Sequence, residues 1–160
     1  MPTDSGETLY FAYGSNIDPE RIRKRIGRIP PSQRARLPSY RLAFNKRALN
    51  GGVYANIMQE ANQEVWGVVY QCTHEEIDVL DQFEGVAGGH YRRERVSVKL
   101  EDGEVVDAIT YVAGDAFICA EGRPSQEYLR HIIQGARQHG LSEEYVKSIE
   151  DLASKDNSAG

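Results

Sequence analysis

The order of strand and helix signals along the 160-residue chain predicts an α+β fold. Three observations support this prediction. About six segments are rich in the β-branched and aromatic residues that are typical of strands, and most of them follow one another in runs. Helix signals are inserted between these runs or follow them, and they do not alternate with single strands. This order favours a twisted, mainly antiparallel sheet, and it leaves open whether the sheet closes into a barrel.

The first predicted element is a strand that ends in a small polar loop. Residues 10–16 read YFAYGSN, so aromatic and apolar residues give way to Gly, Ser and Asn. A helix follows at once, because Asp18 is a favourable N-cap, Pro19 suits the first helical position and Gly27 follows the end. The pattern therefore predicts a strand, a loop rich in backbone donors, and a helix N-terminus.

The remaining elements are marked by strand runs and by capping residues. Further strands are predicted at residues 40–46, 51–59, 64–72, 90–100 and 104–114. Three later helices are each preceded by a capping side chain, namely Thr73, Ser125 and Ser142. Thr73 also forms a capping box with Glu76. The pair Asp102-Gly103 is the signal of a type I′ turn between the last two strands.

Length and composition indicate one globular domain. Hydrophobic residues make up 40% of the chain and charged residues 27%, which is ordinary for a globular protein, so we expect a single domain over 1–160 with flexible tails at 1–7 and 153–160. No apolar run reaches the roughly 20 residues that cross a bilayer, and the polar, acidic N-terminus is no secretory signal. We therefore expect a cytoplasmic protein with no membrane partner, in which Cys72 and Cys119 are structural thiols.

The charge of the chain is unevenly distributed. The net charge is −5, yet residues 21–47 contain ten Lys or Arg and no acidic residue. Such a segment can steer anions or bind nucleic acid. Its arginines are not interleaved with aromatic residues as in RNA-binding patterns, so we expect a solvated basic face and no nucleic-acid partner. A partner-binding role for the segment stays open as an alternative.

Motifs for metals, nucleotides and serine nucleophiles are absent from the sequence. The four histidines, His74, His90, His131 and His139, have no metal-ligand spacing, and the HEEID segment lacks the second His of a zinc motif. There is no G-x-G-x-x-G, no G-K-[ST] and no G-x-S-x-G. We expect no metal and no organic cofactor, and we expect His131 and His139 to face solvent on a helix.

Glu84 is the candidate acid or base. It lies at the C-terminal end of a predicted helix, where the helix dipole disfavours a negative charge. Phe83 and Val86 flank it, and a glycine-rich loop follows. Apolar surroundings raise the pKa of a carboxyl group toward neutral pH, as a group that accepts and returns a proton requires. Taken alone, the same pattern is also typical of a surface glutamate.

Taken together, these stretches resemble the gamma-glutamylcyclotransferase family. The match begins at YFAYGSN, continues through GGVYANI and EVWGVVY, includes LDQFEGVAGGHY, and covers roughly residues 9–152. The combination of Y-G-S-N with a downstream E-G-V…G-x-Y is specific, whereas either half alone is weak. The glutathione-specific branch of the superfamily typically has Leu after Y-G-S. Asn16 therefore favours the branch that acts on gamma-glutamyl amino acids.

The resemblance implies a fold, a reaction and a site. The implied fold is a small mixed, mainly antiparallel β-barrel flanked by helices, with a homodimer as one option. In the implied reaction the α-amine of a gamma-glutamyl group attacks its own γ-carbonyl, so that 5-oxoproline forms and an amino acid leaves without any cofactor. Glu84 would be the catalytic acid and base. The implied substrate-binding residues are Tyr13, Gly14, Ser15, Asn16, Tyr91 and Tyr128.

Within this site, the backbone amides of Gly14, Ser15 and Asn16 would bind the oxyanion, and Tyr13 would position the loop. Two alternatives stay open. The substrate could instead be a gamma-glutamyl amine or a gamma-glutamyl-protected metabolite, because the sequence does not define the far end of the pocket. The chain could also be a non-catalytic member that binds a partner through residues 21–47.

Overall fold

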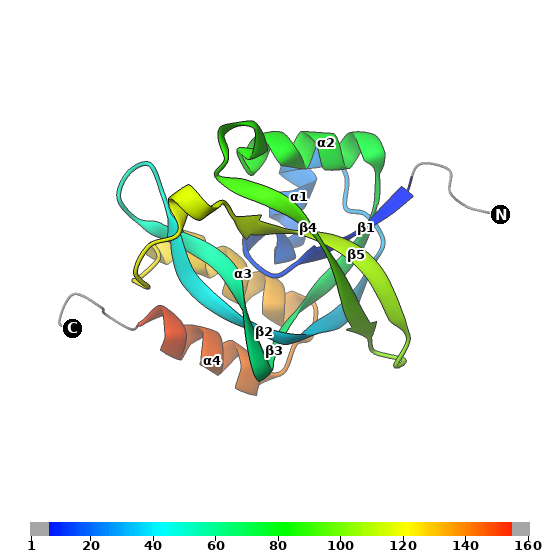
Figure 1. Cartoon of the computed structure of the whole chain (residues 1–160). Coiled ribbons are helices and arrows are strands. Elements are labelled where there is room, and N and C mark those ends of the chain that lie inside the picture. Colours follow the sequence, from blue (N-terminus) through cyan, green and yellow to red (C-terminus); the bar gives the residue numbers. More distant parts are fainter. Residues whose placement is uncertain (1–6, 155–160) are drawn as a thin grey trace.

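The computed structural model describes residues 7–154 (Figure 1). In chain order its elements are β1 (Glu7–Ala12), η1 (Ser15–Ile17), α1 (Pro19–Ile26), β2 (Ser32–Arg47), β3 (Val53–Thr73), α2 (His74–Phe83), η2 (Val86–Gly88), β4 (Tyr91–Leu100), β5 (Val105–Ala113), η3 (Asp115–Phe117), α3 (Gln126–Gln138) and α4 (Glu143–Ala153). Glu7 and Ala153 therefore belong to a strand and a helix and not to tails. Residues 1–6 and 155–160 of the predicted tails lie outside the described residues.

The five strands close into a barrel in the order β1-β3-β2-β4-β5. Neighbouring strands are antiparallel, except that β1 and β5 pair in parallel at Tyr10 and Ile109. Figure 1 shows α1 and α2 on one side of the barrel and α4 on the opposite side. The predicted small mixed, mainly antiparallel barrel flanked by helices is thus confirmed.

Two of the predicted strands are one strand. The segments 51–59 and 64–72 both belong to β3, which is 21 residues long. Asn62 has a positive φ of 68°, and residues 60–63 fall where the register between β2 and β3 shifts. These four residues therefore form an irregularity within a long strand. The partner strand β2 is also longer than predicted, since it begins at Ser32.

The connection between β4 and β5 is not the predicted type I′ turn. A type I′ turn needs positive φ at both central residues, and Asp102 lacks it. The Gly103 amide donates to the Leu100 carbonyl at 3.0 Å, and Gly103 itself has a φ of 90°. This is a three-residue loop with a left-handed glycine, which is the next most common hairpin connection.

The predicted helix starts are confirmed. The Asp18 side chain caps α1, and Thr73 and Glu76 form both hydrogen bonds of the capping box at α2. Ser125 and Ser142 cap α3 and α4. Among the described residues, no helix is long and apolar enough to span a membrane. Both cysteines are free thiols, as predicted.

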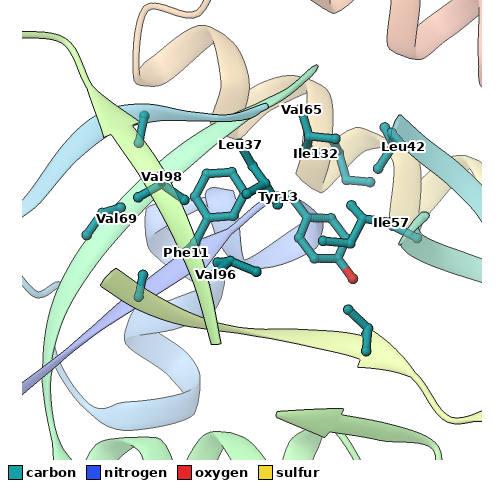
Figure 2. Close-up of a cluster of buried hydrophobic side chains, with 14 of the residues drawn as sticks. Phe11, Tyr13, Leu37, Leu42, Ile57, Val65, Val69, Val96, Val98 and Ile132 are labelled. Carbon is teal, nitrogen blue, oxygen red and sulfur yellow. The ribbon is translucent and has the colours of Figure 1, made fainter. Parts of the chain in front are cut away.

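Strand β1 packs between two hydrophobic clusters because its side chains alternate. Phe11 and Tyr13 point into the barrel, among aliphatic side chains of β2, β3 and β4 and Ile132 of α3 (Figure 2). Tyr10 and Ala12 pack on the other face, in a cluster that includes residues of α1 and α2. Apolar contacts on both faces therefore fix the end of β1 and the start of the loop after it.

The loop after β1 is held in place by α3 and β3. A Cβ added at Gly135 of α3 would lie only 2.4 Å from the Asp18 nitrogen and 2.6 Å from the Ile17 carbonyl carbon, so only glycine allows this approach. From β3, the Tyr70 hydroxyl donates to the carbonyl oxygens of Asn16 and Ile17, at 2.9 and 3.2 Å. The loop conformation thus depends on contacts with two separate elements.

Candidate active site

A cavity of about 440 Å³ lies where the ends of β1 and β2 meet the starts of β3 and β4. All of the site residues predicted from the sequence line it: Tyr13, Gly14, Ser15, Asn16, Glu84, Tyr91 and Tyr128. They come from the β1–η1 segment, the end of α2, β4 and α3. The fold therefore brings together residues that are far apart in the sequence.

Glu84 is the C-cap residue of α2, and its side chain is only 16% exposed. The Arg25 guanidinium of α1 pairs with it, with Nη1 3.1 Å from Oε2. Burial raises the pKa of Glu84, while the positive charges of Arg25, Arg21 and Lys46 act in the opposite direction without cancelling the effect. Glu84 is therefore no surface glutamate, and its carboxyl group has the raised pKa that an acid and base requires.

A hydrogen-bond chain positions Arg25 against Glu84. The same Nη1 of Arg25 donates to Oδ1 of Asn16 at 3.2 Å, and Nδ2 of Asn16 donates to the Tyr10 hydroxyl at 2.9 Å. The Arg25 guanidinium also stacks 4.9 Å from the centre of the Phe83 ring. The side chain of Asn16 is thus used within the protein, where it orients the partner of Glu84.

The loop offers backbone donors to the cavity. The amides of Ile17 and Asp18 donate to the carbonyls of Gly14 and Ser15, which forms the single turn of η1. The first amides of such a turn have no partner within it. In the part of the chain that the structure describes, the amides of Gly14, Ser15 and Asn16 donate to no backbone or side-chain acceptor. These amides are suited to bind a carboxylate or an oxyanion.

The three predicted tyrosines differ in what they can offer a ligand. The Tyr13 hydroxyl donates to the Tyr111 carbonyl at 2.5 Å, and the Tyr91 hydroxyl donates to the Ala55 carbonyl at 2.7 Å. The Tyr128 hydroxyl instead accepts from the Ala55 amide at 3.1 Å. The hydroxyl protons of Tyr13 and Tyr91 are therefore used in hydrogen bonds that stabilise the cavity wall, whereas Tyr128 keeps a hydroxyl proton that it can donate to a ligand.

Known proteins match this chain over nearly its whole length. The model of the AIG2-like family matches residues 64–149. The mouse protein "Gamma-glutamylcyclotransferase" is 34% identical over 154 residues, which cover 92% of this chain and 80% of the mouse protein. The human protein of the same name is 32% identical, with coverage of 96% and 82%. The chain belongs to the gamma-glutamylcyclotransferase family.

Solved structures agree with this family assignment. A structure of a gamma-glutamyl cyclotransferase has a TM-score of 0.81 and 31% identity, over 95% of this chain and 90% of that one. Bacillus subtilis YkqA has a TM-score of 0.83 and 27% identity, over 95% of this chain and 56% of that one. The family resemblance predicted from the two paired motifs is thus confirmed.

The sequence analysis did not predict two of the cationic residues that line the cavity. Arg21 and Lys46 belong to the basic segment that we expected to be a solvated face, yet both line the cavity, and Lys46 is only 3% exposed. A signal was present for Lys46. It follows Leu42 and Phe44 at spacings of two in a predicted strand, and that alternation places it on the inward face.

The prediction that His131 and His139 face solvent is wrong. Nδ1 of His131 lies 2.7 Å from Oδ2 of Asp18, and His139 packs edge-on against the Tyr70 ring. Both lie on the helix face of Gly135, which rests on η1. Within residues 7–154, no group of three or more His, Cys, Asp or Glu side chains is arranged to hold a metal ion.

Proposed function

We propose that the protein is a gamma-glutamylcyclotransferase that acts on gamma-glutamyl amino acids. The α-amine nitrogen of the gamma-glutamyl group forms a bond to its own γ-carbonyl carbon, and the bond from that carbon to the departing amino acid breaks. The products are 5-oxoproline and a free amino acid. The observation that carries this proposal is that one cavity is lined both by a buried carboxyl group of raised pKa and by loop residues whose backbone amides have no acceptor among the described residues.

Glu84 acts as base and then as acid. The substrate α-amine is mostly protonated at neutral pH, because such groups have a pKa of about 8. The Glu84 carboxylate accepts this proton, so that the free amine can attack, and it passes the proton to the nitrogen of the departing amino acid. The second proton, which the ring nitrogen loses on closure, reaches the departing amine by the same route. Burial brings the pKa of Glu84 closer to neutral, while Arg25 keeps the ionised form accessible.

The loop and Tyr128 stabilise the oxyanion that forms on the γ-carbonyl oxygen. A Cβ on Gly14 would lie 3.4 Å from the Tyr128 hydroxyl, so this hydroxyl and the loop face the same space. One such donor typically contributes about 10²- to 10³-fold in rate. Holding the substrate curled supplies much of the rest, since oriented intramolecular reactions reach effective molarities of about 10⁵ to 10⁸ M. Ring closure needs only these effects and proton transfer, so we propose a reaction without metal or organic cofactor.

The decisive experiment is Glu84→Gln. This variant keeps the size of the side chain but cannot accept the ammonium proton, so release of 5-oxoproline from a gamma-glutamyl dipeptide should fall by about 10²- to 10⁴-fold while the substrate still binds. Glu75→Gln on the exposed face of α2 is the matched control and should retain activity. Asp81 is a poorer control because it accepts from Tyr111, which lines the cavity. A folded Glu84→Gln protein with near-parental turnover would overturn the proposal.

The cytoplasmic location, the single domain over 1–160 and the homodimer stay predictions. A gamma-glutamyl amine or a gamma-glutamyl-protected metabolite stays open as the alternative substrate, because the far end of the cavity determines this choice.

A further inference from the structure

Two of the cations that line the cavity have no acidic partner within residues 7–154. Arg25 pairs with Glu84, but among the described residues neither Arg21 nor Lys46 has a carboxylate oxygen within 4.0 Å. The Nε atom of Arg21 is buried and makes no hydrogen bond. A buried, unpaired charge is energetically costly. Lys46 is buried and Arg21 is partly buried, so two cations without a carboxylate partner among the described residues indicate a ligand that brings two negative charges.

Lys46 is held by groups that leave its charge unneutralised. Its Nζ lies 2.7 Å from Nδ1 of His90 and is surrounded by the rings of Phe117, Tyr91 and Tyr54, at 4.7, 5.4 and 5.8 Å. Burial and the neighbouring ammonium lower the pKa of His90, so the imidazole is neutral and accepts the hydrogen bond. An ammonium group has three donors. Lys46 therefore retains two for a ligand.

The two cations come from different elements of the cavity wall, Arg21 from α1 and Lys46 from β2. Arg21 precedes Arg25 by four residues on α1, so the two side chains are neighbours on the Glu84 side of the cavity. The substrate α-amine and α-carboxylate share one carbon, so the α-carboxylate must also lie on that side. Lys46 is the penultimate residue of β2, and Leu49, shortly after the end of that strand, lines the cavity and is 84% exposed. A departing amino acid has to leave through an exposed part of the cavity wall, and Leu49 marks such a part three residues after Lys46.

We propose that Lys46 is a specificity-determining residue that binds the carboxylate of the departing amino acid. This inference rests on the proposed function. Arg21 binds the α-carboxylate of the gamma-glutamyl group. The substrate then has two carboxylates for two unpaired cations, and one ammonium for Glu84. A gamma-glutamyl amine lacks the second carboxylate and leaves Lys46 buried without a partner. Lys46 therefore makes the cavity selective for gamma-glutamyl amino acids.

The test compares two substrates that differ only in this group, gamma-glutamyl-alanine and its C-terminal amide. The wild-type protein should prefer the acid by about 10- to 100-fold in kcat/KM, as expected for a hydrogen bond to a charged group. Lys46→Met keeps the unbranched stem and removes the charge. Because the Lys46 charge also lowers the pKa of Glu84, both substrates are compared on the plateau of the pH profile, where Glu84 is ionised in both proteins. There Lys46→Met should lose this factor on the acid and keep its activity on the amide, which also shows that it is folded. Lys24→Met, on the exposed face of α1, is the matched control and should change neither value.

Two results would overturn the assignment of Lys46. One is an equal loss on both substrates, which indicates a positioning role. The other is equal kcat/KM of the wild-type protein for acid and amide, which needs no variant. If the wild-type protein releases 5-oxoproline from neither substrate, the proposed function fails separately. In that case the assignment of Lys46 is tested by calorimetric binding of the two peptides. Tighter binding of the acid that is lost in Lys46→Met would still support the assignment, and equal binding of acid and amide would refute it.

Discussion

At the scale of single residues, burial and the ion pair with Arg25 have opposite effects on the pKa of the Glu84 carboxyl group. Burial raises the pKa of Glu84, and the Arg25 charge and hydrogen bond lower it. The balance matters because the base must be ionised to accept a proton and must then hold that proton long enough to return it.

We therefore predict that Arg25→Met moves the acid limb of the pH profile of kcat/KM to higher pH. Removing the positive charge raises the pKa of Glu84 further, so at a given acidic pH a larger fraction of Glu84 is protonated and cannot act as base. Activity should recover as the pH rises. Arg23→Met, which removes an exposed arginine of the same helix, should leave the limb in place. An unchanged limb in Arg25→Met would show that Glu84 does not set it.

The sequence predicted some residue roles and missed others for a physical reason. The Y-G-S-N loop and Glu84 stand in local patterns that can be recognised without a structure. The side-chain role of Asn16 cannot be recognised in this way, because it depends on Arg25 of α1 meeting Glu84 of α2. The pairing of Lys46 with His90 likewise requires the end of β2 to face the start of β4.

At the scale of elements, the contact of α3 with η1 determines the shape of the loop. We predict that Gly135→Ala destabilises the protein by about 1–3 kcal/mol, the usual cost of overpacking, because the new Cβ would collide with the backbone of Ile17 and Asp18. It should also lower kcat/KM by displacing the loop amides. Urea unfolding and 5-oxoproline release measure the two effects.

The sign of the Gly135→Ala effect makes this prediction specific. Elsewhere in a helix, Gly→Ala stabilises by roughly 0.5–1 kcal/mol. Gln134→Ala, at the exposed neighbouring position, should leave the activity unchanged. A more stable Gly135→Ala protein with full activity would mean that α3 does not constrain the loop.

The limits of an element were predicted correctly where the residues that determine them lie close together in the sequence. Helix starts were predicted correctly because a cap acts over three residues, as at Thr73 and Ser125. Strand limits were not, because pairing decides them. Residues 60–63 are exposed and mostly polar, and only the pairing of β2 on both sides of them makes β3 one strand.

At the scale of the whole molecule, the fold disperses what looks like a basic patch in the sequence. Six arginines of the segment 21–47 pair with glutamates: Arg23, Arg25, Arg28, Arg34, Arg36 and Arg41. Apart from Glu20 of α1, their partners belong to other elements or connections of the fold, namely the long strand β3, α2 and the segments after α2, β4 and η3. Arg21 and Lys46 line the cavity. This redistribution depends on the tertiary fold, so composition alone could not predict it.

We therefore predict that the protein does not bind nucleic acid, even at low salt. Affinity for a phosphate backbone requires several cations that are free to displace counterions, because each phosphate that Lys or Arg neutralises releases condensed counterions. Of the ten basic residues in the segment, only Lys24 and Arg47 are neither paired with a carboxylate nor part of the cavity lining among the described residues. The fluorescence anisotropy of labelled single-stranded RNA and duplex DNA should stay unchanged as protein is added at about 50 mM salt. A rise in anisotropy that disappears with added salt would contradict this prediction and favour the non-catalytic, partner-binding alternative. It would mean that the ion pairs open and release their arginines to the nucleic acid.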